Sequence, residues 1–160
     1  WSLGWVSRKA GLSHLRAPGT GVATYTASEA FENNVLTSDR DMFDYMQHQT
    51  AVHPELALAG PSLHWVYEAM AETKRLSALP APDIPALAAL GGNERVVAPE
   101  AIRTRMASWP EGSLLDFPGA EHEVMMERPA ARSLFFDSAA GLFSANGATS
   151  GTTEPPVEDG

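Results

Sequence analysis

The stretch "ALAALGGNERVVAPEAIRTRMASWPEGSLLDFPGAEHEV", residues 86 to 124, decides the fold. Its first five residues form a short apolar run that ends at Gly91-Gly92, a pattern typical of a buried strand followed by a turn. Residues 98 to 110 show a helical pattern, and residues 112 to 119 repeat the pattern of a strand and a turn. A second helical pattern covers residues 128 to 143, so the order of strand, helix, strand, helix predicts an α/β fold with a parallel layer.

Apolar side chains at helical spacing define these two helices. The first helix places Ile102, Met106 and Trp109 on one face and ends at Pro110. The second has Pro129 in its first turn, where proline is tolerated. We expect its buried face to consist of Ala131, Leu134, Phe135, Ala139, Leu142 and Phe143.

Two more helices are predicted upstream. "TSDRDMFDYMQHQT", residues 37 to 50, opens with a capping-box pattern in which Ser38 precedes Asp41 by three residues. "GPSLHWVYEAMAETKRLSAL", residues 60 to 79, has Pro61 near its start. The expected apolar stripes are Met42, Tyr45, Met46 and Gln49 in the first helix, and Leu63, Val66, Tyr67, Met70 and Ala71 in the second. Residues 1 to 21 predict a loop-rich segment with one short helix, and residues 144 to 160 a disordered acidic tail.

The composition excludes several classes of function. The chain has 160 residues, 20 acidic against 11 basic, and a net charge of −9, so nucleic acid is not expected as a partner. The absence of cysteine excludes disulfides and a cysteine nucleophile; it leaves the redox compartment open and only weakly favours a reducing one. No apolar run approaches the roughly 18–20 residues of a spanning helix. We therefore expect a soluble cytoplasmic protein; because the sequence begins at Trp1 without a secretory signal, it was either processed or belongs to a longer protein.

The chemistry is expected at the carboxyl ends of the two strands, where the loops of a parallel sheet open. The loop after the first strand carries Glu94 and the loop after the second carries His122. This places a carboxylate and an imidazole on one edge of the sheet, which is the acid and the base of a Ser-His-acid arrangement.

Other interpretations of these two residues stay open. His122 is equally typical of a solvated loop histidine, and Glu94 could pair with Arg95 or Arg103 on the surface. The flanking acids could raise the pKa of His122 without any catalysis. These acids are Glu121, Glu123 and Glu127.

Neither a metal site nor a nucleophile is evident. His14, His48, His53 and His64 fall in different elements, without an HExxH motif, so no metal and no cofactor are expected. A nucleophile elbow has the pattern G-x-S-x-G. The near matches are "GLSHL" with Ser13 and "GPSLH" with Ser62, and each lacks the second glycine. We therefore expect no nucleophile in this chain.

Three stretches, in this order, resemble the C-terminal half of an α/β-hydrolase of the bacterial lysophospholipase and monoacylglycerol lipase type. They are "NNVLTSDRDMFDYMQHQTAVHPELALAGPSLHWVYEAM", "LGGNERVVAPEAIRTRM" and "LLDFPGAEHEVMMERPAARSLFFD". The resemblance covers about residues 30 to 143, and "GAEHEVMME" is similar to the family's histidine loop. It implies a partial α/β-hydrolase fold: residues 22 to 78 as a helical cap or lid, and residues 79 to 143 as the last strands and helices of the parallel core sheet.

The resemblance also implies roles for individual residues. His122 matches the catalytic histidine, and Glu94 falls where the family places its acid, more usually an aspartate. The elbow serine and the oxyanion loop come earlier in the family and have no counterpart here. Leu36 and Trp65, with other apolar cap residues, would hold the acyl chain, although such stripes are more often plain core.

The function implied is serine-dependent hydrolysis of a small lipid or ester, in a fragment that is inactive alone and that contacts a membrane surface transiently through its cap. One alternative is a non-catalytic binding module of the same fold that docks to a partner. Another is a hydrolase that uses Glu94 and His122 with water or a metal ion.

Overall fold

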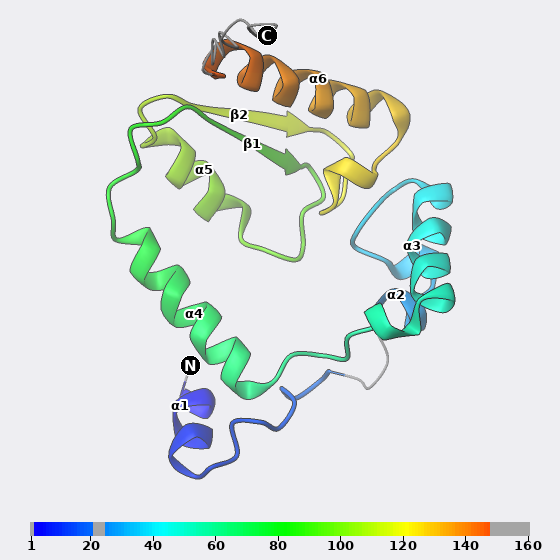
Figure 1. Cartoon of the computed structure of the whole chain (residues 1–160), viewed down its shortest axis with the longest axis vertical. Coiled ribbons are helices and arrows are strands. Elements are labelled where there is room, and N and C mark those ends of the chain that lie inside the picture. Colours follow the sequence, from blue (N-terminus) through cyan, green and yellow to red (C-terminus); the bar gives the residue numbers. More distant parts are fainter. Residues whose placement is uncertain (1, 21–24, 148–160) are drawn as a thin grey trace, which may run out of the picture.

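The computed structural model describes residues 2–20 and 25–147, and it contains a two-stranded parallel sheet with helices on both sides (Figure 1). Strand β1, Ala86–Gly91, pairs with β2, Gly112–Phe117, with Ala86 opposite Gly112 and Gly91 opposite Phe117. Helix α5, Pro99–Ala107, connects the strands, and α6, Pro129–Asn146, follows them on the opposite side of the sheet. The predicted order of strand, helix, strand, helix and the parallel pairing are confirmed.

Two glycine-containing turns end the strands. Gly91 approaches the loop after β2 so closely that a Cβ atom there would lie 2.1 Å from the backbone oxygen of Glu121. Gly119 has a φ of 79°, a left-handed conformation that glycine adopts without strain. Glycine at these positions lets the two loops pass each other at the carboxyl edge of the sheet.

Helix α6 begins at Pro129 as predicted but runs to Asn146, three residues beyond the expected end. Ala131 and Phe135 pack against the cluster of Phe117, Ala120 and Val124. The predicted buried face is wrong at two positions, since Leu134 and Phe143 are 52% and 72% exposed. The reason is that a sheet of two strands covers only a narrow stripe of the helix. The tail predicted beyond this helix falls, from residue 148 on, outside the described residues.

Helix α3, Arg40–Val52, starts from a different cap than the sequence predicted. Asp39, and not Ser38, is the N-cap: its side chain accepts hydrogen bonds from the backbone N–H groups of Asp41 and Met42. The buried face of the helix also differs from the predicted one. Phe43 is 1% exposed, whereas the expected Tyr45 is exposed to solvent.

The remaining helices form the N-terminal and middle parts of the chain. Helix α4, Leu63–Ser77, is capped by Ser62, whose hydroxyl accepts from the backbone N–H of Trp65. It packs against α1, Ser2–Lys9, which is the short helix expected near the N-terminus. The shorter elements are α2, Tyr25–Ser28, and the 3-10 helices η1, Phe31–Asn33, η2, Pro54–Leu56, and η3, Val124–Met126.

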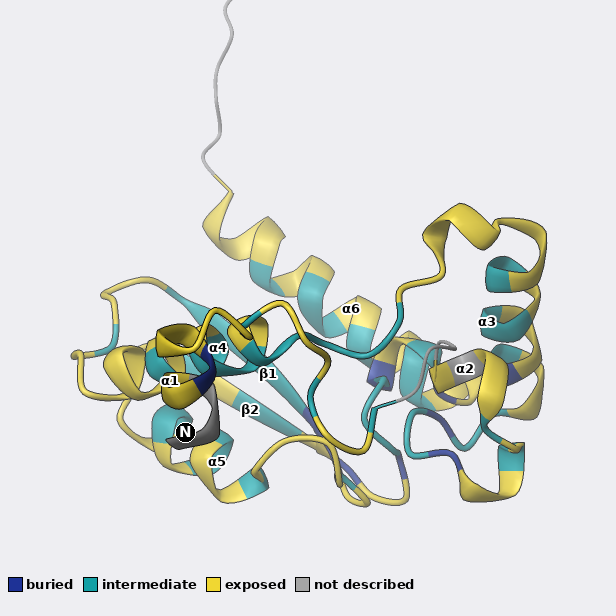
Figure 2. Cartoon of the chain, turned by 90° about the horizontal axis from the view of Figure 1, so that it is seen from below, coloured by how far each residue is buried: buried dark blue, intermediate teal, exposed yellow. Residues whose placement is uncertain are grey.

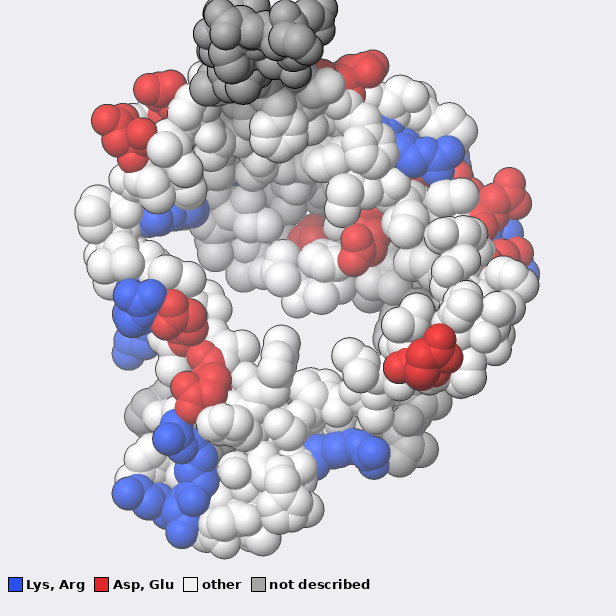
Figure 3. Space-filling model, viewed as in Figure 1, with Lys and Arg blue, Asp and Glu red and all other residues white. Residues whose placement is uncertain are grey.

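Burial is concentrated near the carboxyl ends of the strands (Figure 2). The buried apolar residues among those described are Phe43, Leu90, Phe117, Ala120 and Val124. The elements surround an open centre, and an opening remains there in the space-filling view (Figure 3). None of the described helices is both long enough and apolar enough to cross a bilayer.

Candidate functional site

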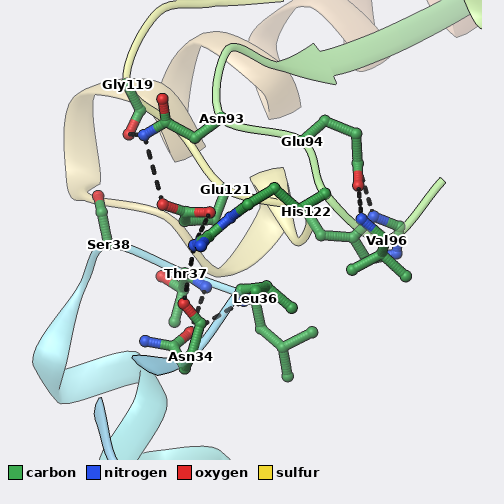
Figure 4. Close-up of polar contacts among 12 residues, drawn as sticks. Asn34, Leu36, Thr37, Ser38, Asn93, Glu94, Val96, Gly119, Glu121 and His122 are labelled. Carbon is green, nitrogen blue, oxygen red and sulfur yellow. Dashed lines mark hydrogen bonds and ion pairs between the residues drawn. The ribbon is translucent and has the colours of Figure 1, made fainter. Parts of the chain in front are cut away.

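The site is built where the loops after β1 and β2 lie against each other (Figure 4). The backbone N–H of Gly92 donates to the carbonyl of Phe117 at 2.9 Å, and that of Asn93 donates to Ala120 at 2.9 Å. These bonds continue the pairing of the strands by one step into the loops. The two loops are therefore held in a fixed register at the carboxyl edge of the sheet, the location that the sequence predicted for the chemistry.

Glu94 and His122 meet in this register. Nδ1 of His122 lies 2.7 Å from Oε2 of Glu94. The Glu94 side chain is 4% exposed and the His122 side chain 28% exposed, so the carboxylate is enclosed while the imidazole keeps one side open. The structure thus brings together the two residues that the strand-end argument selected.

Backbone donors fix the other oxygen of the carboxylate. Oε1 of Glu94 accepts hydrogen bonds from the backbone N–H groups of Val96, at 2.6 Å, and Val97, at 3.1 Å. Burial raises the pKa of the Glu94 carboxyl, but the hydrogen bond from His122 and those from the two backbone groups outweigh burial. Its pKa therefore lies below the ordinary value of 4.5, and the group is a carboxylate at neutral pH.

This geometry selects one tautomer of the histidine. An ionised carboxylate can only accept, so Nδ1 of His122 carries the proton in the 2.7 Å hydrogen bond. Nε2 of the neutral imidazole is then left with a free lone pair. A partly exposed imidazole held in this tautomer by a buried carboxylate is able to act as a general base.

The alternative ion pairs considered for Glu94 do not form. Arg95 donates to Oε2 of Glu121 at 3.1 Å. Arg103 binds both carboxylate oxygens of Asp116, at 2.6 and 3.0 Å. The hydrogen bond from Arg103 holds the pKa of the Asp116 carboxyl below its ordinary value. Both arginines are thus engaged with other carboxylates than Glu94.

The acids that flank His122 have separate roles. Besides Arg95, Glu121 binds the side-chain amide of Asn93 at 3.3 Å. Glu127 is 1% exposed and accepts several hydrogen bonds from the surrounding backbone. The sequence did not predict the burial of Glu127, because a glutamate in "MMERP" has no pattern that distinguishes a buried acid from a solvated one.

A segment that precedes α3 forms one wall of the site. The backbone N–H groups of His122 and Glu123 donate to the carbonyls of Val35, at 3.2 Å, and Leu36, at 2.7 Å. The segment itself is folded by Asn34, whose Oδ1 accepts from the backbone N–H groups of Leu36 and Thr37. Figure 4 shows this segment beside the histidine loop.

The two proposed substrate-binding residues lie in different places. Leu36 is half-buried next to the histidine loop. Trp65 is 63% exposed on α4, the helix that packs against α1. A cavity of about 340 Å³ is lined by Trp5, Arg8, Lys9 and Tyr67, none of which belongs to the loops with Glu94 and His122, so we do not assign it to this site.

The charged and metal-binding side chains of the described residues give no second site. Some Lys and Arg side chains pair with Asp or Glu, as in Arg8–Glu68 and Arg75–Glu72, and a group of Lys and Arg gathers at the lower left of Figure 3. Within residues 2–20 and 25–147, no group of three or more His, Asp or Glu side chains is arranged to hold a metal ion.

Sheet, crossover helix and histidine loop together make up part of an α/β-hydrolase fold. A monoglyceride lipase from Saccharomyces cerevisiae, solved as a soluble variant with a substrate analogue, matches with a TM-score of 0.55 over 74% of this chain and 42% of that chain. The two share 14% sequence identity, so this match concerns the fold.

In sequence, the chain is similar to lysophospholipase L2 of Escherichia coli K12 and of E. coli O6:H1 strain CFT073. Each is 29% identical over 135 residues, which cover 79% of this chain and 40% of the relative. The chain therefore spans well under half the length of these relatives. No protein-family model matches it. The resemblance to the lysophospholipase type, predicted from the motifs, is confirmed by the sequence similarity, and the partial α/β-hydrolase fold is confirmed by the structural match.

Proposed function

We propose that this chain supplies the general base and the orienting acid of a serine-dependent carboxylic ester hydrolase. The observation that carries the proposal is the 2.7 Å contact between Nδ1 of His122 and Oε2 of Glu94 at the carboxyl edge of a parallel sheet. The similarity to lysophospholipase L2 and to a monoglyceride lipase supports a lipid ester as the substrate. Because the 160 residues contain no G-x-S-x-G sequence, the nucleophilic serine would come from polypeptide outside them.

In the proposed reaction, Nε2 of His122 removes the proton from the serine hydroxyl as the oxygen attacks the ester carbonyl. The resulting imidazolium then gives that proton to the leaving alcohol oxygen, which leaves an acyl-enzyme. In the second half, Nε2 takes a proton from water as the water oxygen attacks the carbonyl of the acyl-enzyme. The imidazolium then gives this proton to the serine oxygen as the fatty acid leaves, which restores the serine and the neutral histidine. Glu94 stays ionised throughout and stabilises the imidazolium through Nδ1, in keeping with the lowered pKa of its carboxyl.

We assign the acyl group to the side of the site formed by residues 22 to 78, as a cap, with residues 79 to 143 as part of the catalytic core. Leu36 is the candidate contact nearest to His122, and Trp65 would contact the lipid further away. Several apolar side chains of the cap are exposed, which supports transient contact with a membrane surface. They include Leu56 at 62%, Leu58 at 79% and Trp65 at 63%.

The test starts from the coding sequence. We would read it upstream of Trp1 for an in-frame G-x-S-x-G and express the complete reading frame. Its hydrolysis of p-nitrophenyl esters and of monoacylglycerol would be compared with that of the His122→Ala variant. We expect this substitution to lower kcat by a factor on the order of 10³ or more. His64→Ala, which removes an exposed histidine on α4, is the matched control and should leave the rate unchanged.

The isolated 160-residue chain provides a second measurement. It should neither hydrolyse these esters nor react with a fluorophosphonate probe, since both require an activated serine. Ester hydrolysis by the isolated chain that persists after treatment with the probe would contradict the proposal. That result would favour a water-based reaction at Glu94 and His122 instead.

The exposed apolar surface supports a second candidate, a non-catalytic module that docks to a partner. Within the described residues the sheet has two strands, so neither outer edge has a neighbouring strand. Phe136 and Phe143 on α6 are 52% and 72% exposed. If translation starts at or near Trp1 and a complex with a partner shows no ester hydrolysis, this candidate replaces the enzyme.

A further inference from the structure

Glu127 is a buried carboxylate with four hydrogen-bond donors around it. Oε1 accepts from the backbone N–H of Ser38 at 2.9 Å and from that of Glu121 at 2.8 Å. Oε2 accepts from the Ser38 hydroxyl at 2.6 Å and from the backbone N–H of Arg128 at 3.3 Å. A carboxylate that is 1% exposed is costly unless its oxygens are satisfied, and here both are. The surrounding backbone is therefore arranged around the two oxygens of Glu127.

These donors come from two segments that are far apart in sequence. Ser38 lies just before α3, while Glu121 directly precedes His122 in the histidine loop. Thr37 adds a third connection, because its hydroxyl donates to the carbonyl of Met126 at 2.7 Å. The carboxylate of Glu127 thus connects the segment before α3 to the histidine loop.

His122 lies at the centre of this connection. The preceding residue is held by Glu127 through its backbone N–H. The N–H of His122 itself and that of Glu123 are held by the carbonyls of Val35 and Leu36, in the same segment that Ser38 belongs to. Loss of the carboxylate would remove both hydrogen bonds by which Ser38 holds this segment against the loop. The backbone of His122 would then be free to shift relative to Glu94.

We propose that Glu127 is a positioning residue for the base: it sets the backbone of His122 so that Nδ1 meets Glu94. The effect of Glu127 on catalysis rests on the function proposed above, whereas its effect on the position of His122 does not. Glu127 itself stays out of the reaction, since its oxygens are occupied by Ser38, Glu121 and Arg128. The position of Ser38, just before α3, is thereby linked to the position of His122 relative to Glu94.

The test is NMR spectroscopy on the full 160-residue chain, labelled with ¹⁵N in the backbone and in the histidine rings. Two readouts are needed: hydrogen exchange at the backbone amides of His122 and Glu123, and the resonance of the Nδ1 proton of His122. We expect Glu127→Ala to speed exchange at both amides by about tenfold or more, since the segment that carries their acceptors, the carbonyls of Val35 and Leu36, is then held less firmly against the loop. The Nδ1 proton signal should shift or broaden beyond detection.

Two further substitutions separate positioning from mere stability. Glu127→Asp keeps the charge but shortens the side chain, so it should loosen His122 in the same way. Glu127→Gln keeps an oxygen that can accept from Ser38 and Glu121, so it should restore the His122 signals to near the wild-type values. Glu123→Gln is the matched control, because it removes a carboxylate next to His122 that takes no part in this connection. It should change exchange by less than about twofold.

A folded Glu127→Ala chain with unchanged His122 exchange and an unchanged Nδ1 proton would overturn the proposal. If Glu127→Ala does not fold, the same result in Glu127→Asp overturns it. None of these measurements requires turnover, so the outcome is separate from that of the ester hydrolysis test. Failure of hydrolysis with altered His122 signals would remove the proposed function and leave Glu127 as the residue that positions His122.

Discussion

Oε2 of Glu94 receives the Nδ1 proton of His122 at 2.7 Å, across 28 residues of sequence and between two neighbouring strand ends. The same carboxylate is anchored by two backbone N–H groups on its other oxygen. Glu94 therefore cannot turn away from His122 without losing those bonds. The imidazole is oriented by a partner that is itself fixed, which is the condition that a general base needs.

We predict that Glu94→Gln inverts the tautomer of His122. The amide oxygen should keep the two backbone donors, which leaves the NH₂ group facing Nδ1. Nδ1 must then accept, so the proton moves to Nε2 and the base loses its lone pair. The ¹⁵N chemical shifts of the imidazole report the change directly. Glu121→Gln, which alters a carboxylate bound to Arg95 and Asn93, should leave the tautomer as it is.

The lowered pKa of Glu94 predicts how stability depends on pH. A carboxyl whose pKa is lower in the folded state stabilises the fold fully above its unfolded value, here 4.5, and loses that contribution as pH falls through the lower folded value. The difference in unfolding free energy between wild type and Glu94→Gln should therefore shrink as the pH falls below about 5. Urea titrations at several pH values below about 5 measure it. A difference that grows as the pH falls through this range would contradict the assignment.

Gly91→Ala should displace the histidine loop. The added Cβ would lie 2.1 Å from the backbone oxygen of Glu121 and 2.7 Å from that of Ala120, and backbone atoms cannot move aside cheaply. We expect a loss of about 1–3 kcal/mol in stability and a changed Nδ1 proton signal of His122. Gly141→Ala is the control, because its Cβ meets nothing within 4 Å and lies inside a helix. It should be neutral or stabilising by up to about 1 kcal/mol.

Asp39→Ala and Ser38→Ala should have different effects, although the two residues are adjacent. Asp39 caps α3, so its loss should cost about 0.5–2 kcal/mol and speed amide exchange at Asp41 and Met42. Ser38 bonds Glu127 instead, so its loss should leave those amides protected. Protection measured at Met42 separates the two. If Ser38→Ala loses protection at Met42 and Asp39→Ala does not, then Ser38 is the N-cap, as the sequence predicted.

The strand order and the meeting of Glu94 with His122 could be predicted because both follow from local patterns and one topological rule. Short apolar runs that end in glycine define the strands, and parallel pairing brings their carboxyl ends together. No contact between distant segments had to be known in advance. The roles of Glu94 and His122 in catalysis stay predictions until the variants are measured.

The parts that could not be predicted depend on contacts between distant segments. Ser38 fits a capping box locally, but its hydroxyl is taken by Glu127, and Asp39 caps the helix instead. Spacing alone assigned Phe143 to the buried face of α6, yet a two-stranded sheet is too narrow to reach it. In each case a partner far along the chain decided the outcome.

The buried face of α3 gives the last prediction. Spacing selected Tyr45, whereas the structure buries Phe43, which packs edge-on against Phe31 with ring centroids 5.7 Å apart. Phe43→Leu should therefore cost about 1 kcal/mol through lost packing, and Tyr45→Leu should stay within about 0.5 kcal/mol of wild type. Urea midpoints of the two variants decide between the faces, because the helix propensities of the two substitutions are alike. A larger loss in Tyr45→Leu would mean that α3 is rotated from the position described, and the segment before α3 would then be unable to hold the histidine loop as it does here.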